Sequence, residues 1–332
     1  MRNKRATIKD VAALAETSVS VVSYVLNNKP GISISDSTKE RIFAAAAKLN
    51  YVPNSAARAL RKGSENTIAF FAFWNTEDSS YNKFLSGLTH AATKKGYSIT
   101  LCDNAALKKE KLIALHNQLN FGSVIVLLSG NPYIDDNKIK EADILSALKA
   151  INIPALVING EEDISKHGLD ALHFGFFETA FFATEYLINE GCKKIAYLKD
   201  DLALTFEKER LKGFYAAMSK YGLSEHSVIT TNDIEKLLCG DLPDGVVCNK
   251  SDTGYLFLKA AKENKVNVPK SIKVIAANNE SFAEYLEPSL TTVALPLREF
   301  GKMAAYKIIN KVENKNYALP QLEYKVIVRE SV

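Results

Sequence analysis

The sequence predicts an α/β protein with an N-terminal three-helix helix-turn-helix head and a two-lobed core of doubly wound parallel sheets. Three observations support this fold class. The 332 residues are enough for about two domains and a small extra module. The first 50 residues show helical periodicity, and from residue 66 onward strand-like and helix-like runs alternate. With 47% hydrophobic and 24% charged residues, the composition is that of an ordinary globular protein.

The head begins with two short helices. Thr7 and Asp10 form a T-x-x-D capping box before a helix expected over 8–15. After a three-residue break, Ser18 is placed to cap a second helix that ends near Asn27. Two helices joined by so short a turn are typical of a helix-turn-helix.

A third helix closes the predicted core of the head. Ser35 or Ser37 caps it, and its expected inward stripe is Ile42, Phe43, Ala46 and Leu49. In a helix-turn-helix the second helix enters the major groove with its first turns nearest the bases. The residues on that face are Val19, Ser20, Ser23 and Tyr24. For Val19, simple packing inside the head is an equally good interpretation.

The positive charge of the chain is concentrated in this head. Residues 1–65 hold eleven lysines and arginines against five acidic residues, a balance of +6, whereas the remainder balances at −2. Lysine and arginine bind polyanions because they displace counterions condensed on phosphates. Composition alone leaves a solvated basic tail open as an alternative, and the helical periodicity argues against it.

The runs 7–12 (TIKDVA) and 19–27 (VSVVSYVLN) resemble the head of the lactose repressor (LacI/GalR) family of bacterial transcription regulators. The resemblance implies a sequence-specific DNA-binding regulator, most simply a repressor. Members often carry arginine where this chain has Tyr24. Arginine makes a two-pronged contact with guanine that tyrosine cannot make, so we expect an altered base preference at that position.

The segment 51–61 (YVPNSAARALR) is similar to the family's hinge. Pro53 ends the preceding helix, Asn54 can cap the next, and the run 55–62 is too short to be a stable helix alone. We expect it to order on DNA and against its twin in a second subunit. By resemblance, Leu60 is the wedge driven into the minor groove; the alternative is an ordinary linker. The candidate DNA contacts are Thr7, Ser18, Val19, Ser20, Ser23, Tyr24, Asn27, Asn54, Leu60 and Arg61.

The core is predicted from strand-like runs that alternate with helical ones. The expected strands are 67–73, 97–102, 123–128, 154–158, 193–198, 226–231, 244–248 and 271–276. The expected helices are 81–95, 107–120, 138–151, 177–190, 206–221 and 251–264. Two doubly wound sheets make two lobes, and the crevice between them is the default ligand site.

Motifs of the core extend the resemblance over most of the chain, notably 209–214 (ERLKGF) and 290–301 (LTTVALPLREFG). The same core resembles periplasmic sugar-binding proteins, whose chain crosses between lobes three times. The implied crossings lie near 160–163, 289–294 and 317–322. The implied divisions are a head (1–52), a hinge (53–64), a first lobe (65–162 plus 294–318) and a second lobe (163–290 plus 321–332).

The family pattern also implies an effector pocket. Arg210 matches an arginine that anchors polar groups of the ligand, and Asn249 matches the asparagine of an Ala-Asn-Asp motif. The chain departs from the pattern at Lys250, at Asn278 and at 173–180 (HFGFFETA), where acidic or Asp-Asn residues are usual. We therefore expect a more positive pocket and an anionic or phosphorylated effector held by Arg210 and Lys250.

Aromatic residues of the core are candidates for stacking on that effector. Tyr81 and Phe176, with Phe177, can pack on the ligand, although core packing is the stronger alternative for such a run. Lys250 can also simply point to solvent. The candidate effector contacts are Tyr81, Phe176, Arg210, Asn249, Lys250 and Asn278.

Other classes of protein lack support in the sequence. There is no nucleophile elbow, phosphate loop, dinucleotide fingerprint or H-E-x-x-H helix, so no enzymatic activity, cofactor or metal is expected. The longest apolar run, 68–74, is too short to span a membrane, and four scattered cysteines suggest free thiols in the cytoplasm.

We expect a homodimer, because two heads must meet the two half-sites of a pseudo-palindromic operator. Two alternatives stay open: a regulator controlled by a partner protein, and a cytoplasmic sugar-binding protein that merely shares the core. The second has no need of residues 1–62.

Overall fold

The computed structural model describes residues 6–26, 34–49, 51, 66–73, 79–128, 139–160, 163–200 and 205–332. The chain divides into two compact units, Met1–Ser64 and Glu65–Val332. The predicted hinge (53–64) lies outside the described residues, and with it the predicted DNA contacts Asn54, Leu60 and Arg61; Asn27 also lies outside them.

The head contains the three predicted helices, α1 (Ile8–Leu14), α2 (Val19–Leu26) and α3 (Asp36–Lys48). The capping box of Thr7 and Asp10 starts α1, and Ser35 caps α3. Val11, Val22 and Ile42, one from each helix, are fully buried and form the centre of the small core.

One predicted core residue of the head is wrong. Phe43 is 54% exposed, and the buried residues of α3 are Ile42, Ala45 and Ala46. Positions three and four apart share a helix face, whereas a neighbour lies about 100° away around the axis. Ile42 faces the core, so Phe43 is turned away from it.

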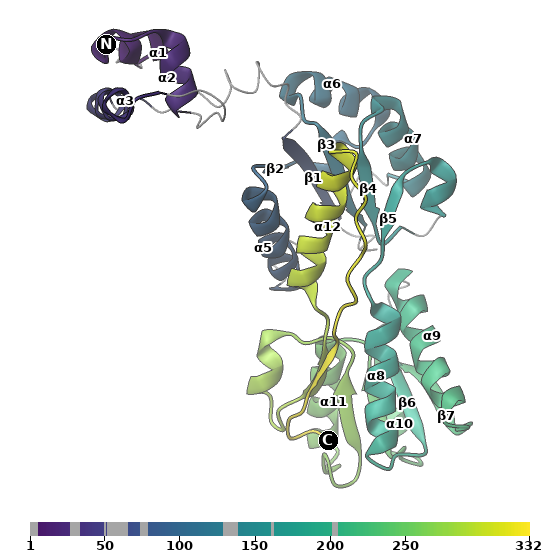
Figure 1. Ribbon diagram of the computed structural model, residues 1–332. Helices are drawn as coiled ribbons and strands as arrows, with labels where there is room; N and C mark the ends of the chain where they lie inside the picture. Colours follow the sequence, from purple (N-terminus) through teal and green to yellow (C-terminus); the bar gives the residue numbers. More distant parts are fainter. Residues whose placement is uncertain are drawn as a thin grey trace. The chain divides into compact units, whose positions relative to one another are not determined.

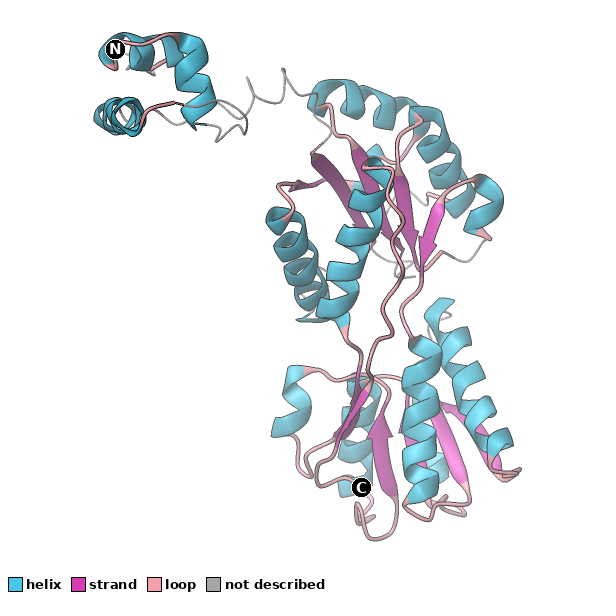
Figure 2. Cartoon of the chain, in the orientation of Figure 1, coloured by secondary structure: helices cyan, strands magenta, loops and turns pink. Residues whose placement is uncertain are grey.

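The first lobe is a five-stranded parallel sheet in the order β2-β1-β3-β4-β5, covered by helices on both faces (Figures 1 and 2). Its elements in chain order are β1 (Thr67–Phe73), α5 (Ser79–Lys94), β2 (Ser98–Leu101), α6 (Lys109–Leu119), β3 (Ser123–Leu128), α7 (Glu141–Ile151), β4 (Ala155–Ile158) and β5 (Asp170–Leu172). Side chains alternate along β1, because successive residues of a strand point to opposite faces. Ile68 and Phe70 pack under α5 and the returning helix α12 (Leu297–Val312), whereas Ala69 and Phe71 pack under α6 and α7.

The second lobe is a six-stranded sheet in the order β11-β10-β9-β8-β6-β7, in which β11 alone of the described strands pairs antiparallel. Its elements in chain order are α8 (Phe176–Asn189), β6 (Ile195–Lys199), α9 (Thr205–Lys220), β7 (His226–Thr230), α10 (Ile234–Leu238), β8 (Gly245–Cys248), α11 (Ser251–Glu263), β9 (Lys273–Ala276), β10 (Thr291–Ala294) and β11 (Lys325–Ile327). Helix α8 packs beside α9 over one face, and the core under α11 fills the other (Figure 1).

The predicted lobe boundary at residues 162 and 163 is wrong. β5 pairs in parallel with β4, from Leu156 opposite Asp170 to Ile158 opposite Leu172, so it belongs to the first sheet. The chain leaves that sheet after Leu172. A three-residue edge strand has too few side chains to show a period, which is why the sequence did not reveal it. The later crossings lie between β10 and α12 and between α12 and β11 (Figure 1).

Two pairs of helices pack at very short range through glycine. A Cβ atom on Gly301 of α12 would lie 2.1 Å from the backbone oxygen of Phe84 in α5. In the second lobe, a Cβ atom on Gly213 of α9 would lie 2.1 Å from the backbone oxygen of Phe177 in α8. Each pair sits directly beside a crossover. Among the described residues, no helix has both the length and the apolar character needed to cross a membrane.

Candidate functional site

The first candidate surface is the start of α2 in the head. Ser18 and Ser20 are exposed, and Ser23 and Tyr24 are half-buried. Val22 and Val25 of the same helix are buried, so the serines lie on the face turned away from the core. This polar edge has the placement that a helix needs to approach base edges.

Three of the predicted DNA contacts also have structural roles in the head. The Ser18 hydroxyl accepts a hydrogen bond from the Val21 N–H at 3.2 Å, and so caps α2. Val19 is half-buried and packs against the core, as the packing interpretation predicts. The hydroxyl and the backbone N–H of the exposed Thr7 both donate hydrogen bonds to the Asp10 carboxylate, each at 2.7 Å. DNA contact by these residues stays a prediction.

The second candidate site surrounds Arg210 of α9 in the core. The side chain is 4% exposed, and its guanidinium lies over the rings of Phe176 at 5.0 Å and Phe206 at 4.9 Å. Burial lowers the pKa of Arg210, and the nearby charges of Glu207 and Asp200 act in the opposite direction. Its Nε and Nη1 atoms are buried without a hydrogen-bond acceptor among the described residues. Two buried donors are thus available to oxygen atoms of a ligand.

Asn249 is part of a buried network beside Arg210. Its Nδ2 donates to Glu207 at 2.6 Å, and its Oδ1 accepts from Thr253 at 2.8 Å. Glu207 also accepts from the Tyr197 hydroxyl at 2.7 Å; burial and the Glu207 charge raise the pKa of Tyr197. Since both ends of the Asn249 amide are engaged, its role in this structure is to hold Glu207 in place.

The predicted positive excess of the pocket is wrong. Lys250 forms an ion pair with Asp200, and both side chains are largely buried. Its ammonium also lies 5.4 Å from the centre of the Phe206 ring. With Arg210 and Glu207, the site contains two cations and two carboxylates, so its net charge does not favour an anionic effector. Asp200 directly follows β6. Ligand sites of α/β sheets lie at the carboxyl ends of the strands, so this position is the signal by which Asp200 could have been predicted from the sequence.

Asn278 lies within the second lobe, beside a contact between the two lobes. Its Oδ1 accepts from the Ser251 N–H at 2.6 Å, and its Nδ2 donates to Glu280 at 3.2 Å. Glu280 in turn accepts from the hydroxyls of Ser79 and Ser80, each at 2.5 Å, at the start of α5 in the first lobe. This carboxylate therefore ties the lobes together.

Tyr81 belongs to the core of the first lobe. It is 5% exposed, and its ring stacks on Phe70 with centroids 6.4 Å apart and planes at 12°. Core packing, the alternative given for this residue, describes its position; contact with an effector stays a prediction.

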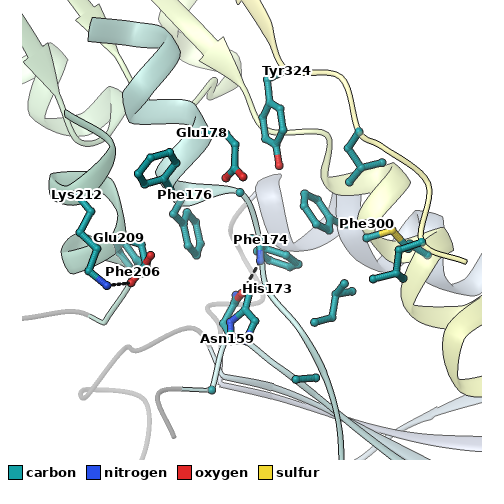
Figure 3. A pocket seen from close by; sticks show the side chains of 18 of the residues that line it. Asn159, His173, Phe174, Phe176, Glu178, Phe206, Glu209, Lys212, Phe300 and Tyr324 are labelled. Atoms are coloured by element: carbon teal, nitrogen blue, oxygen red, sulfur yellow. Dashed lines mark hydrogen bonds and ion pairs between the residues drawn. The ribbon is translucent and has the colours of Figure 1, made fainter. Parts of the chain in front are cut away.

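A cavity of about 1060 Å³ opens where the first and third crossovers pass between the lobes. Its lining includes Phe174, Phe206, Phe300 and Tyr324 and the carboxylate of Glu178 (Figure 3). Of the six predicted effector residues, all of them described, Phe176 alone lines this cavity. Sequence reasoning missed Glu178 and Tyr324, because the cavity forms only when distant crossovers meet.

The sequence matches two family models. That for "Bacterial regulatory proteins, lacI family" covers residues 7–54, and that for "Periplasmic binding protein-like domain" covers residues 184–332. Among curated proteins, the "HTH-type transcriptional repressor PurR" of Vibrio parahaemolyticus is 26% identical over 98% of both chains. The PurR of Aliivibrio salmonicida is also 26% identical, over 98% of this chain and 99% of that protein.

Solved structures show the same fold. The lac repressor dimer bound to operator and the anti-inducer ONPF has a TM-score of 0.78 at 19% identity, over 99% of both chains. The complex of the transcriptional regulator CelR with cellobiose has a TM-score of 0.62 at 21% identity, over 99% of this chain and 100% of that one.

Proposed function

The chain belongs to the LacI/GalR family of bacterial transcriptional regulators, and on this premise we propose that it represses transcription as a homodimer on a pseudo-palindromic operator. The observation that carries the proposal is the head: three helices with a capped second helix whose polar edge faces outward. A protein that only binds a small molecule has no use for such a unit. The place of action is the cytoplasm, where the DNA is.

Recognition of the operator rests on two kinds of contact. Ser20, Ser23 and Tyr24 of α2 read base edges in the major groove, and the basic residues of the head neutralise phosphates. Tyr24 lacks the guanidinium group with which an arginine makes a bidentate contact with guanine. The base preferred at that position is therefore not restricted to guanine by such a contact. Leu60 opens the minor groove as a wedge.

The effector is a small polar molecule of the sugar or sugar phosphate class. Arg210 supports this, because two of its N–H donors are buried and unpaired, and ligand hydroxyl or phosphate oxygens would satisfy them. Binding between lobes changes the angle between them and shifts the population of the DNA-competent state. The change in operator affinity then equals the difference in effector affinity between the two states.

The test starts from operators selected out of random duplex DNA by the full chain. We expect affinity for them to fall steeply with salt, and Leu60→Ala to lose the specific complex while keeping weak binding to any duplex. Failure to enrich any sequence would overturn the proposed repressor, and an unchanged operator affinity of the variant would remove the wedge.

The effector is sought by thermal shift with sugars and sugar phosphates, because a ligand that binds the folded state raises the melting temperature by mass action. Arg210→Met should lose the shift while operator affinity without ligand is retained. A shift that persists in this variant would place the effector elsewhere.

A further inference from the structure

The interlobe cavity differs in character from the site around Arg210. Phe174 anchors its wall: the ring lies 4.9 Å from that of Phe300 and 5.9 Å, edge-on, from that of Phe176. Met303 and Leu322 extend the apolar lining. The Phe174 N–H donates to Asn159 at 2.8 Å, which fixes the first crossover at the cavity (Figure 3). These side chains come from both lobes and from the crossovers.

Tyr324 closes the cavity from the third crossover. A Cβ atom on Gly175 would lie 1.8 Å from its hydroxyl oxygen, so the ring occupies space that only a glycine leaves open. Its hydroxyl points into the cavity near the Glu178 carboxylate (Figure 3). Burial and the charge of Glu178 raise the pKa of Tyr324, and the phenol therefore stays neutral.

Glu178 supplies a charge that the cavity does not balance. Among the described residues, none makes a hydrogen bond or ion pair with its half-buried carboxylate. The other acids of the lining have partners, since Glu209 pairs with Lys212 at 2.6 Å and Asp163 with Lys166 at 3.4 Å. Lys208 is exposed to solvent at the rim.

The position of Glu178 in the first turn of α8 is favourable for an acid, because the N-terminus of a helix carries partial positive charge. That accounts for an acid on the helix but not for the aromatic walls around it. Leaving a carboxylate unpaired in apolar surroundings costs free energy. Pairing with a cation therefore stabilises it more there than it would in water.

We propose that this cavity binds an organic cation, an amine whose ammonium group pairs with Glu178 and whose apolar body lies against Phe174, Phe300 and Met303. The ring and hydroxyl of Tyr324 contact the ammonium group, the ring through a cation–π interaction. Phe176 and Phe206 contribute less, since the Arg210 guanidinium already lies over them. This site is additional to the one proposed for the polar effector, and it does not depend on that proposal.

The ligand also acts on the lobes. Its contacts come from α8 of the second lobe, α12 of the first and both crossovers, so a ligand in the cavity favours the lobe arrangement in which these elements meet. A volume near 1000 Å³ suits a molecule of drug size.

The experiment compares three probes of one shape on the full chain by calorimetric titration: phenethylammonium, the neutral 2-phenylethanol and the anionic phenylacetate. We expect the ammonium probe to bind at least tenfold more tightly than the alcohol. Glu178→Gln should remove that preference, because the amide keeps the shape of the side chain and loses its charge. The matched control is Glu209→Gln, a charge at the same cavity that already has a lysine partner, and it should keep the preference.

Three outcomes would overturn the proposal: equal affinity for the ammonium and the alcohol, a preference for phenylacetate, or a preference that survives Glu178→Gln. Absence of binding by the ammonium probe at millimolar concentration counts as equal affinity. Because operator binding is measured without any of these probes, failure here leaves the proposed repressor unaffected.

Discussion

The Glu280 carboxylate is the point at which a single substitution should change the balance between lobe arrangements. Its two oxygens accept hydrogen bonds from Ser79 and Ser80 across the lobe interface, each at 2.5 Å, and one also accepts from Asn278 within its own lobe. Glu280→Ala removes both interlobe bonds. Beside them, Lys83 donates a hydrogen bond to the Asn279 carbonyl at 3.2 Å, and this contact is exposed.

The expected change in free energy follows from the type of hydrogen bond that the substitution removes. A hydrogen bond to a charged group contributes about 1.5–3 kcal/mol. The contact is partly buried, and water can replace the carboxylate once the lobes separate, so we take about 2–3 kcal/mol for the pair together. At 1.4 kcal/mol per factor of ten, the equilibrium between lobe arrangements shifts about 30- to 140-fold toward separation.

The assay is energy transfer between a dye on the exposed Cys239 of the second lobe and a dye on a cysteine introduced at Lys111 of α6 in the first. Glu330→Ala is the matched control, because Glu330 accepts from Ser289 at 2.9 and 3.0 Å but lies wholly in the second lobe. An unchanged transfer efficiency in Glu280→Ala, or an equal change in Glu330→Ala, would refute the reasoning.

Two further predictions concern stability and reactivity. Gly301→Ala should lower the melting temperature by about 2–6 °C, because overpacking against a backbone oxygen of α5 costs about 1–3 kcal/mol and outweighs the gain in helix propensity. In Gly254→Ala the added methyl group meets only the tip of the Leu290 side chain, at 2.7 Å, so the melting temperature should change little. Equal effects of the two substitutions in thermal melts would contradict this prediction. Burial raises the pKa of Cys192 to about 11. At pH 8 a thiol reagent should therefore label the exposed Cys239 before Cys192, and the reverse order of labelling would contradict this prediction.

The sequence determined the features that depend on neighbouring residues. The three head helices could be placed because capping residues such as Thr7 and Ser18 and the apolar repeat act within a few positions. The alternation of strands and helices was recognisable for the same reason, and it predicted both sheets of the core. Arg210 could be singled out by its resemblance to a family motif, and the structure shows it buried.

Only the tertiary structure decided how the charges and rings of the core are matched. Lys250 meets Asp200 from a position 50 residues away, and Glu280 meets Ser79 across 201 residues. Glu178 and Tyr324 share a cavity because two crossovers pass side by side. Such contacts depend on where each strand ends and where each crossover runs, which local periodicity does not encode. The sequence therefore shows which amino acids are available to the site, whereas the folding of both lobes decides which side chains contact one another.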